Sequence, residues 1–150
     1  MSAEPRSGGQ RRRDTEHRLA HDVDVWVASA SADGAPYLVP LSFAWEDGAL
    51  LVATATDSPT GRNLAALGSA RLGLGHTRDV SMIDGEVEVL GLDALPRERG
   101  DRFAERTGFD PRVLQTPYSW FRITPRRIQA WREVNELPER ELMRDGRWLV

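Results

Sequence analysis

Cysteine and lysine are both absent from this chain. Without cysteine there are no disulfide bonds, no thiolate catalysis and no cysteine-ligated metal. Without lysine there is no Schiff-base chemistry, and all 20 basic residues are arginine. No apolar run approaches the roughly 20 residues that span a bilayer, and the first residues lack an apolar signal core. We therefore expect a cytoplasmic protein with no membrane partner.

An excess of positive charge is also missing, since the net charge is −3. This composition gives no electrostatic reason to expect a nucleic-acid partner. At 150 residues, with 40% apolar and 29% charged residues, the chain has the length and composition of one soluble globular domain. We expect a disordered tail over residues 1–13, which end in three arginines, and a single domain over residues 14–150.

Histidines are few, and two of them are spaced like metal ligands. His17 and His21 lie four residues apart in a short helix that Asp14 or Thr15 is expected to cap. Neither a third histidine nor an acidic ligand pattern follows within the same segment. We interpret both as surface residues and predict no metal site.

Short apolar strands dominate the chain from Val23 onward, because apolar residues recur there with a period of two. Asp33-Gly34 and Asp47-Gly48 are typical hairpin turns between the first three strands. Pro40 lies inside the second strand and has no backbone N–H, which places it at an edge, a bulge or an open ladder. Strands are expected over residues 23–28, 37–45, 49–54, 70–77, 81–92, 118–124 and 127–132, with a terminal hairpin over residues 142–150.

Two segments between the strands have the pattern of helices. Residues 58–67 begin with capping residues and a proline and end at Gly68, and residues 95–107 end at Gly108. Asp84-Gly85 falls inside the strand 81–92 and predicts a bulge or bend. The fold class is therefore mainly β with small helices (α+β), and we expect a small antiparallel β-barrel.

Catalytic motifs are missing from the chain. There is no Gly-x-Ser-x-Gly elbow, no Gly-x-Gly-x-x-Gly turn, and His76 has no carboxylate at a recognisable position. Glu86 and Glu88 share one face of a strand, where carboxylates are ordinarily solvated. We nominate no catalytic residue and expect a cofactor to carry any chemistry.

The segment from Ala53 to Leu64 has the features of a phosphate site. A strand ends in hydroxyl residues, the chain turns through Pro59 and Gly61, and Arg62 stands at the start of a helix. Hydroxyls and helix N–H groups donate to phosphate, and a guanidinium neutralises its charge. The hydroxyl cluster before Arg62 favours the phosphate role over that of an ordinary surface arginine, whereas Thr54 and Ser58 could equally serve only the strand end and the helix cap.

The order of these features resembles the pyridoxamine 5′-phosphate oxidase-like family, the FMN-binding split barrels. The resemblance covers about residue 23 to the C-terminus. It implies a six-stranded antiparallel split β-barrel and a homodimer with one flavin at each end of its interface. The residues that it assigns to the cofactor are Val39, Pro40, Leu41, Ser42, Ala53 and Thr54 along the ring and ribityl chain, Ser58, Thr60 and Arg62 at the phosphate, Asp79 and Val80 from the partner chain, and Trp131 and Arg140 near the C-terminus.

Two departures from the family pattern narrow the function. Many members have a lysine or arginine where this chain has Thr60. The true oxidases carry Arg-x-His just after the C-terminal tryptophan to hold their substrate's phosphate, whereas this chain has Val134 to Pro138, including the acidic Glu136. The resemblance thus implies an FMN-dependent oxidoreductase acting on a small organic substrate, but not on vitamin B6 phosphates. The alternatives are an F420-binding reductase of the same fold and a non-catalytic flavin- or haem-binding module.

Overall fold

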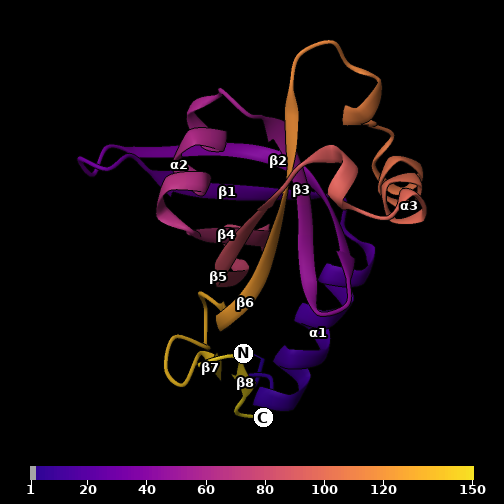
Figure 1. Ribbon diagram of the computed structural model, residues 1–150. Helices are drawn as coiled ribbons and strands as arrows, with labels where there is room; N and C mark the ends of the chain where they lie inside the picture. The colour runs from indigo at the N-terminus through magenta and orange to yellow at the C-terminus, as the bar shows by residue number, and fades with distance from the viewer. Residues whose placement is uncertain (1–2) are drawn as a thin grey trace.

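The strands form one antiparallel sheet that closes into a barrel (Figure 1). The computed structural model describes residues 3–150. Within them the sheet order is β3-β2-β1-β4-β5-β6-β7-β8, and β3 also pairs with β6. That extra pairing closes six strands, which confirms the predicted barrel. The strands are β1 (Asp24–Ala30), β2 (Pro36–Glu46), β3 (Ala49–Ala55), β4 (Ser69–His76), β5 (Asp79–Leu90), β6 (Tyr118–Arg132), β7 (Glu141–Arg144) and β8 (Arg147–Trp148).

The barrel is split between β2 and β3. Residues 36–42 of β2 pair with β1, whereas β2 pairs with β3 only over residues 43–46. The last residues of β3, 53–55, pair with β6 instead. The Phe43 N–H donates to the Val23 carbonyl, 2.8 Å away on the β1 side. Because N–H directions alternate along a strand, the nitrogen of Pro40 faces the open side, where no hydrogen bond is lost.

A bulge lies where Asp84-Gly85 predicts one. The register between β5 and β6 shifts between these two residues, which pair with Arg127 and Pro125 and leave Arg126 as the extra residue. A Cβ on Gly85 would lie 2.6 Å from Ile123 Cγ2, so only glycine fits there. The two strands expected over 118–124 and 127–132 are therefore one strand, β6, with the bulge at the expected gap.

Helices α2 (Pro59–Leu67) and α3 (Arg97–Thr107) flank the barrel on opposite sides, with short 3-10 turns at Leu92–Ala94 (η1) and Pro111–Val113 (η2) (Figure 1). Helix α2 has the predicted ends, because Ser58 caps it and Gly68 adopts a φ of 67° after its last residue. Helix α3 begins two residues later than expected and ends before Gly108 as expected.

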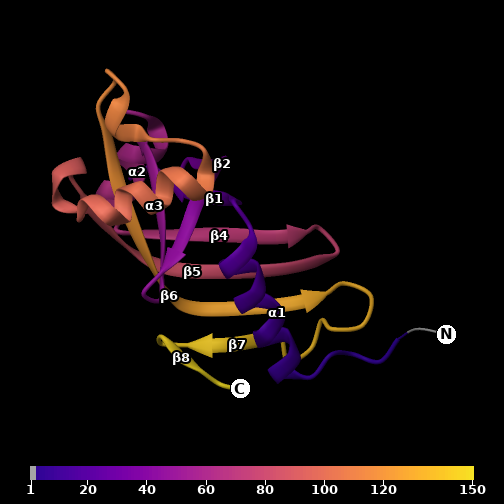
Figure 2. The same cartoon turned by 90° about the vertical axis from the view of Figure 1, so that its right-hand side faces the viewer.

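The N-terminal region differs from the expectation of a disordered tail over residues 1–13. Residues 8–13 belong to helix α1 (Gly8–His21), which Ser7 caps and which crosses β5, β6 and β7 in Figure 2. Residues 1 and 2 lie outside the described part. The buried face of α1 consists of Arg11, Thr15 and Leu19, spaced four apart. Only one of these is apolar, so the amphipathic pattern that would have extended the predicted helix is missing from the sequence.

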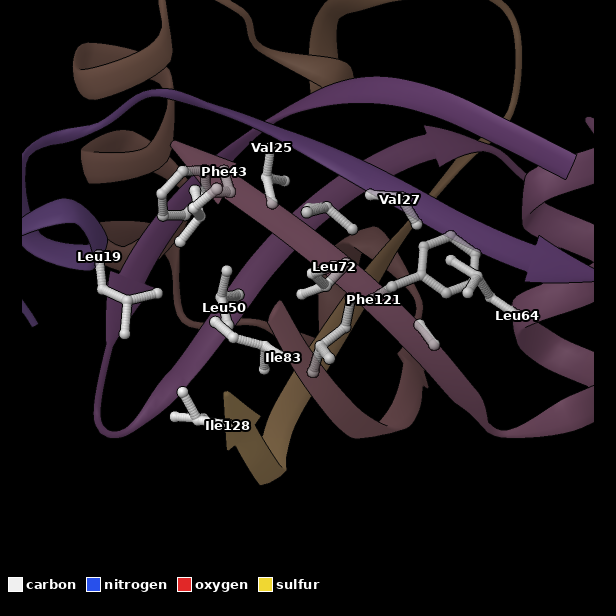
Figure 3. Close-up of a cluster of buried hydrophobic side chains, with 14 of the residues drawn as sticks. Leu19, Val25, Val27, Phe43, Leu50, Leu64, Leu72, Ile83, Phe121 and Ile128 are labelled. Carbon is white, nitrogen blue, oxygen red and sulfur yellow. The ribbon is translucent and has the colours of Figure 1, made fainter. Parts of the chain in front are cut away.

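Two buried clusters share the strand β3. Its Leu50 and Val52 point into the barrel, where they join the larger cluster shown in Figure 3, while Leu51 and Ala53 face a second cluster under α3. Trp120 and Phe103 form the centre of that second cluster, with ring centroids 4.9 Å apart. Strand β3 is thus buried on both faces and holds the split edge rigidly in place.

Candidate functional site

A cleft of about 230 Å³ opens at the split between β2 and β3. Because β2 and β3 pair only between residues 43–46 and 49–52, residues 36–42 of β2 and 53–55 of β3 diverge and leave a gap that no strand fills. The cleft brings together five of the residues predicted to line the flavin, namely Pro40, Leu41, Ser42, Ala53 and Thr54. Val39, the sixth, is half-buried and packs against the barrel core instead.

Three aromatic residues that sequence reasoning did not assign to the site complete the cleft. Phe103 comes from α3, Phe109 from the segment after it, and Tyr118 from the first position of β6. The rings of Phe109 and Tyr118 lie 5.7 Å apart at a tilt of 50°. No local pattern marks these residues, because Phe103 reaches the cleft only when α3 packs beside β2, and Tyr118 only when β6 pairs with β3.

The hydroxyl of Ser58 is engaged by the start of α2. It accepts a hydrogen bond from the Gly61 N–H at 3.0 Å, donates to the Ala55 carbonyl at 2.7 Å, and lies 3.4 Å from the Thr54 hydroxyl. A Cβ on Gly61 would lie 2.4 Å from the Ala55 carbonyl oxygen, so the strand and the helix meet more closely than any other residue allows. The helix N-terminus is thereby held directly beyond the end of β3.

The other two predicted phosphate residues differ in exposure. Thr60 is buried, and its hydroxyl has no hydrogen-bond partner among the described residues. Arg62 is exposed and donates to the Asp57 carbonyl at 2.5 Å, but it forms no ion pair with any carboxylate in residues 3–150. Arg62 is therefore one of the arginines of residues 3–150 whose charge no carboxylate neutralises.

A second group of predicted site residues gathers at the other end of β5 and β6. Val80 and Trp131 are directly opposite each other in the β5–β6 ladder, and the Arg140 guanidinium lies 4.6 Å from the centroid of the Trp131 ring. Asp79, at the start of β5, completes the group. The cleft at the split is lined by none of these four residues, so a single chain presents the predicted site in two parts.

The carboxylate of Asp79 is surrounded by three arginines. Its distances to the guanidinium nitrogens are 2.9 Å for Arg18, 3.1 Å for Arg132 and 3.3 Å for Arg6. Partial burial by itself would raise the pKa of Asp79, but hydrogen bonds from Arg18 and Arg132 hold it below its ordinary value. Asp79 is therefore ionised at neutral pH, and its charge is compensated within the chain.

Glu136 has a different role from the repulsion of phosphorylated substrates that the sequence predicts. It is fully buried, and its carboxylate accepts hydrogen bonds from the Arg6 side chain at 2.7 and 3.0 Å and from the backbone N–H groups of Arg6 and Arg132. Burial alone would raise the pKa of Glu136, yet these hydrogen bonds lower it to about 2. The charge faces Arg6 inside the protein and is not directed at a ligand.

An apolar surface lies on the outer face of the barrel. Trp26 on β1 and Leu38 on β2 are 52% and 59% exposed. They border a hollow of about 440 Å³ that extends over β4 to Val80 and Met82. Large apolar side chains that are exposed together are typical of a surface that another protein covers.

Among the described residues, no helix is both long enough and apolar enough to cross a membrane.

Comparison with known proteins identifies the family of this chain. The model of the family described as pyridoxamine 5′-phosphate oxidase matches residues 17–132. A search of curated proteins finds no significant match. Solved structures with a similar fold include an F420 reductase, with a TM-score of 0.61 and 18% identity over 75% of this chain and 94% of the other. A FAD-binding protein from Mesorhizobium loti has a TM-score of 0.62 and 20% identity over 78% of this chain and 89% of the other. General Stress Protein 26 from Bacillus anthracis has a TM-score of 0.61 and 18% identity over 80% of this chain and 92% of the other.

Proposed function

Because the chain belongs to the pyridoxamine 5′-phosphate oxidase family, we propose that it is an oxidoreductase that holds FMN and transfers hydride between this cofactor and a small organic substrate. The cleft at the β2–β3 split is the site of binding. The observation that carries the proposal is the position of this cleft beside the start of α2, where Arg62 offers a positive charge that no carboxylate neutralises.

The residues present fit a phosphorylated flavin. The cleft combines apolar side chains with the hydroxyls of Ser42 and Thr54, which matches a flat ring that carries polar edges. The N-terminus of α2 follows the cleft residue Thr54, whose hydroxyl lies 3.4 Å from that of Ser58, and Arg62 belongs to the first turn of this helix. A helix N-terminus and an arginine both favour a phosphate. When bound, FMN supplies hydride transfer at its ring nitrogen N5. The chain orients the ring through Pro40 and Thr54 and excludes water from one of its faces.

The second group of site residues would reach the cofactor from a partner copy. Trp26 and Leu38 lie on an exposed apolar face that extends to Val80, so a second chain that covers this face also meets one member of the group. We therefore propose a homodimer in which Asp79, Val80, Trp131 and Arg140 of one protomer complete the pocket of the other. Obligate interfaces of this kind are apolar, as this face is.

F420 is the second candidate cofactor, because one structure with this fold is an F420 reductase. This deazaflavin has the same phosphate-bearing side chain and an additional anionic tail. Its tail would require further arginines with no acidic partner close to Arg62. Arg71, which lies in the strand after α2, is paired with Asp84 at 2.6 Å. That pairing favours FMN.

The substrate is expected to lack a phosphate. A site for pyridoxine phosphate must neutralise a dianion with fixed cationic donors. Residues 132–140, which follow Trp131, hold two arginines: Arg132 is bound to Asp79, and Arg140 stacks on the Trp131 ring and is assigned to the cofactor. A neutral or weakly charged molecule fits this site better.

The visible spectrum and a titration of the purified protein test the proposal. A two-band flavin spectrum supports FMN, a single deazaflavin band supports F420, and a Soret band indicates haem. FMN binding is then followed by flavin fluorescence for the parent, for Arg62→Ala and for the control Arg13→Ala, which removes an exposed arginine on α1. Loss of one charge-assisted contact should weaken binding by about 1.5–3 kcal/mol, or roughly ten- to a hundredfold. No binding of any flavin by the parent refutes the proposal.

A further inference from the structure

The segment before α1 is fastened to the opposite end of the chain. Asn135 donates to the Ala3 carbonyl at 2.5 Å, and the backbone N–H of Arg6 donates to Glu136 at 2.8 Å. The side chain of Arg6 is only 8% exposed. A short segment without regular structure of its own is thus held by side chains about 130 positions away in the sequence.

Arg6 joins three carboxylates that come from three different elements. Its guanidinium contacts Asp14 on α1 at 2.8 Å, Asp79 at the start of β5 at 3.3 Å, and Glu136 in the loop after β6 at 2.7 Å. Glu136 is fully buried and has Arg6 as its only ion-pair partner among the described residues. A buried carboxylate keeps its charge only when it is paired, so the positions of Arg6 and Glu136 depend on each other.

The contacts of Arg6 reach the residues that are proposed to complete the cofactor pocket of the partner copy. Asp79 pairs in register with Arg132, and the next pair along the ladder is Val80 with Trp131. Arg132 also donates its side chain to Asp79 and its backbone N–H to Glu136. Arg6 therefore contacts one member of the second group, Asp79, directly, and two further members, Val80 and Trp131, form the next pair along the ladder.

We propose that residues 3–7 act as a strap in which Arg6 is a positioning residue. By binding Asp79 and Glu136 together, it holds the start of β5 and the loop after β6 in the arrangement that completes the cofactor pocket of the partner copy. The inference rests on the proposed function. It goes further in assigning a role at the cofactor site to a segment that lies outside the barrel.

The obvious variant, Arg6→Ala, leaves Glu136 buried without a partner and can unfold the protein. The double variant Arg6→Ala/Glu136→Gln avoids this, because it removes the guanidinium of Arg6 together with the buried charge of Glu136. The glutamine side chain still accepts the hydrogen bond from the Arg132 N–H. Arg13→Ala serves as the matched control, since Arg13 is an exposed arginine on α1, close to Arg6 in the sequence, and bonds only to the side chain of Gln10. A fourth variant, Ile123→Val, lowers stability through the barrel core and leaves the strap intact.

FMN titration at a temperature where all variants are folded gives the decisive comparison. We expect the dissociation constant of the double variant to rise tenfold or more, with less quenching of the flavin fluorescence in the saturated complex. Arg13→Ala and Ile123→Val should match the parent in both readouts, and Arg6→Lys, which keeps the charge but not the planar fork, should recover part of the affinity. Equal affinity and quenching in the parent and the double variant would overturn the strap while leaving the proposed function intact. A parent that binds no flavin would overturn both.

Discussion

Replacement of Glu136 by glutamine is expected to cost about 3 kcal/mol of the free energy of unfolding at neutral pH. The hydrogen bonds from Arg6 and Arg132 lower the pKa of this carboxyl from 4.5 to about 2. Each unit of pKa difference between the folded and unfolded protein corresponds to about 1.4 kcal/mol. Glutamine keeps the shape and still accepts N–H groups, but it cannot form the ion pair with Arg6.

The pH dependence of this loss has a definite sign. A carboxylate whose pKa is lowered by folding contributes its full stabilisation above the unfolded pKa of 4.5 and loses it as the pH falls toward 2. The parent and Glu136→Gln should therefore differ most at pH 7, differ less at pH 3, and converge near pH 2. Urea unfolding at one fixed protein concentration, repeated at several pH values, measures this difference.

Glu133→Gln is the matched control for this experiment. Glu133 lies three residues earlier and pairs with Arg78, but both side chains are largely exposed. Exposed pairs contribute about 0–1 kcal/mol, so this variant should unfold close to the parent at every pH. A difference between parent and Glu136→Gln below about 1 kcal/mol at pH 7, or one that does not change with pH, would show that the buried carboxylate is not clamped as described.

Further predictions concern the helix start, the apolar face and the substrate. Gly61→Ala should lower the free energy of unfolding by about 1–3 kcal/mol in urea titrations, since its Cβ would collide with the Ala55 carbonyl, whereas Gly9→Ala, with space for a Cβ, should leave it unchanged or raise it. Leu38→Asp should convert the expected dimer into monomers in light scattering, and Val113→Asp, at an exposed site on η2, should not; a parent that is monomeric and still binds flavin would contradict the two-chain site. The flavin-loaded protein should form no pyridoxal phosphate from pyridoxine phosphate and oxygen, as followed by absorbance, and turnover like that of a true oxidase would contradict the substrate assignment.

The sequence by itself predicted the barrel and, through the family resemblance, five of the residues that line the cleft. Strand periodicity, the turn pairs and the caps of α2 are local features, because they depend on side-chain alternation and on backbone angles that a few adjacent residues decide. Pro40 could be placed at an edge, a bulge or an open ladder for the same reason, since proline cannot donate a hydrogen bond, and the structure selects the open ladder. The bulge at Asp84-Gly85 also followed from a glycine inside an apolar strand.

Only the tertiary structure decided which distant residues meet. Phe103 lines the cleft because α3 packs beside β2, and Tyr118 because β6 pairs with β3; no spacing in the sequence predicts either contact. The burial of Arg6 and Glu136 could not be predicted from the sequence either, because charged residues are expected at the surface unless a buried partner of opposite charge is known. Their attraction depends on distance in space, and it takes the closed barrel to bring the two ends of the chain within hydrogen-bonding reach.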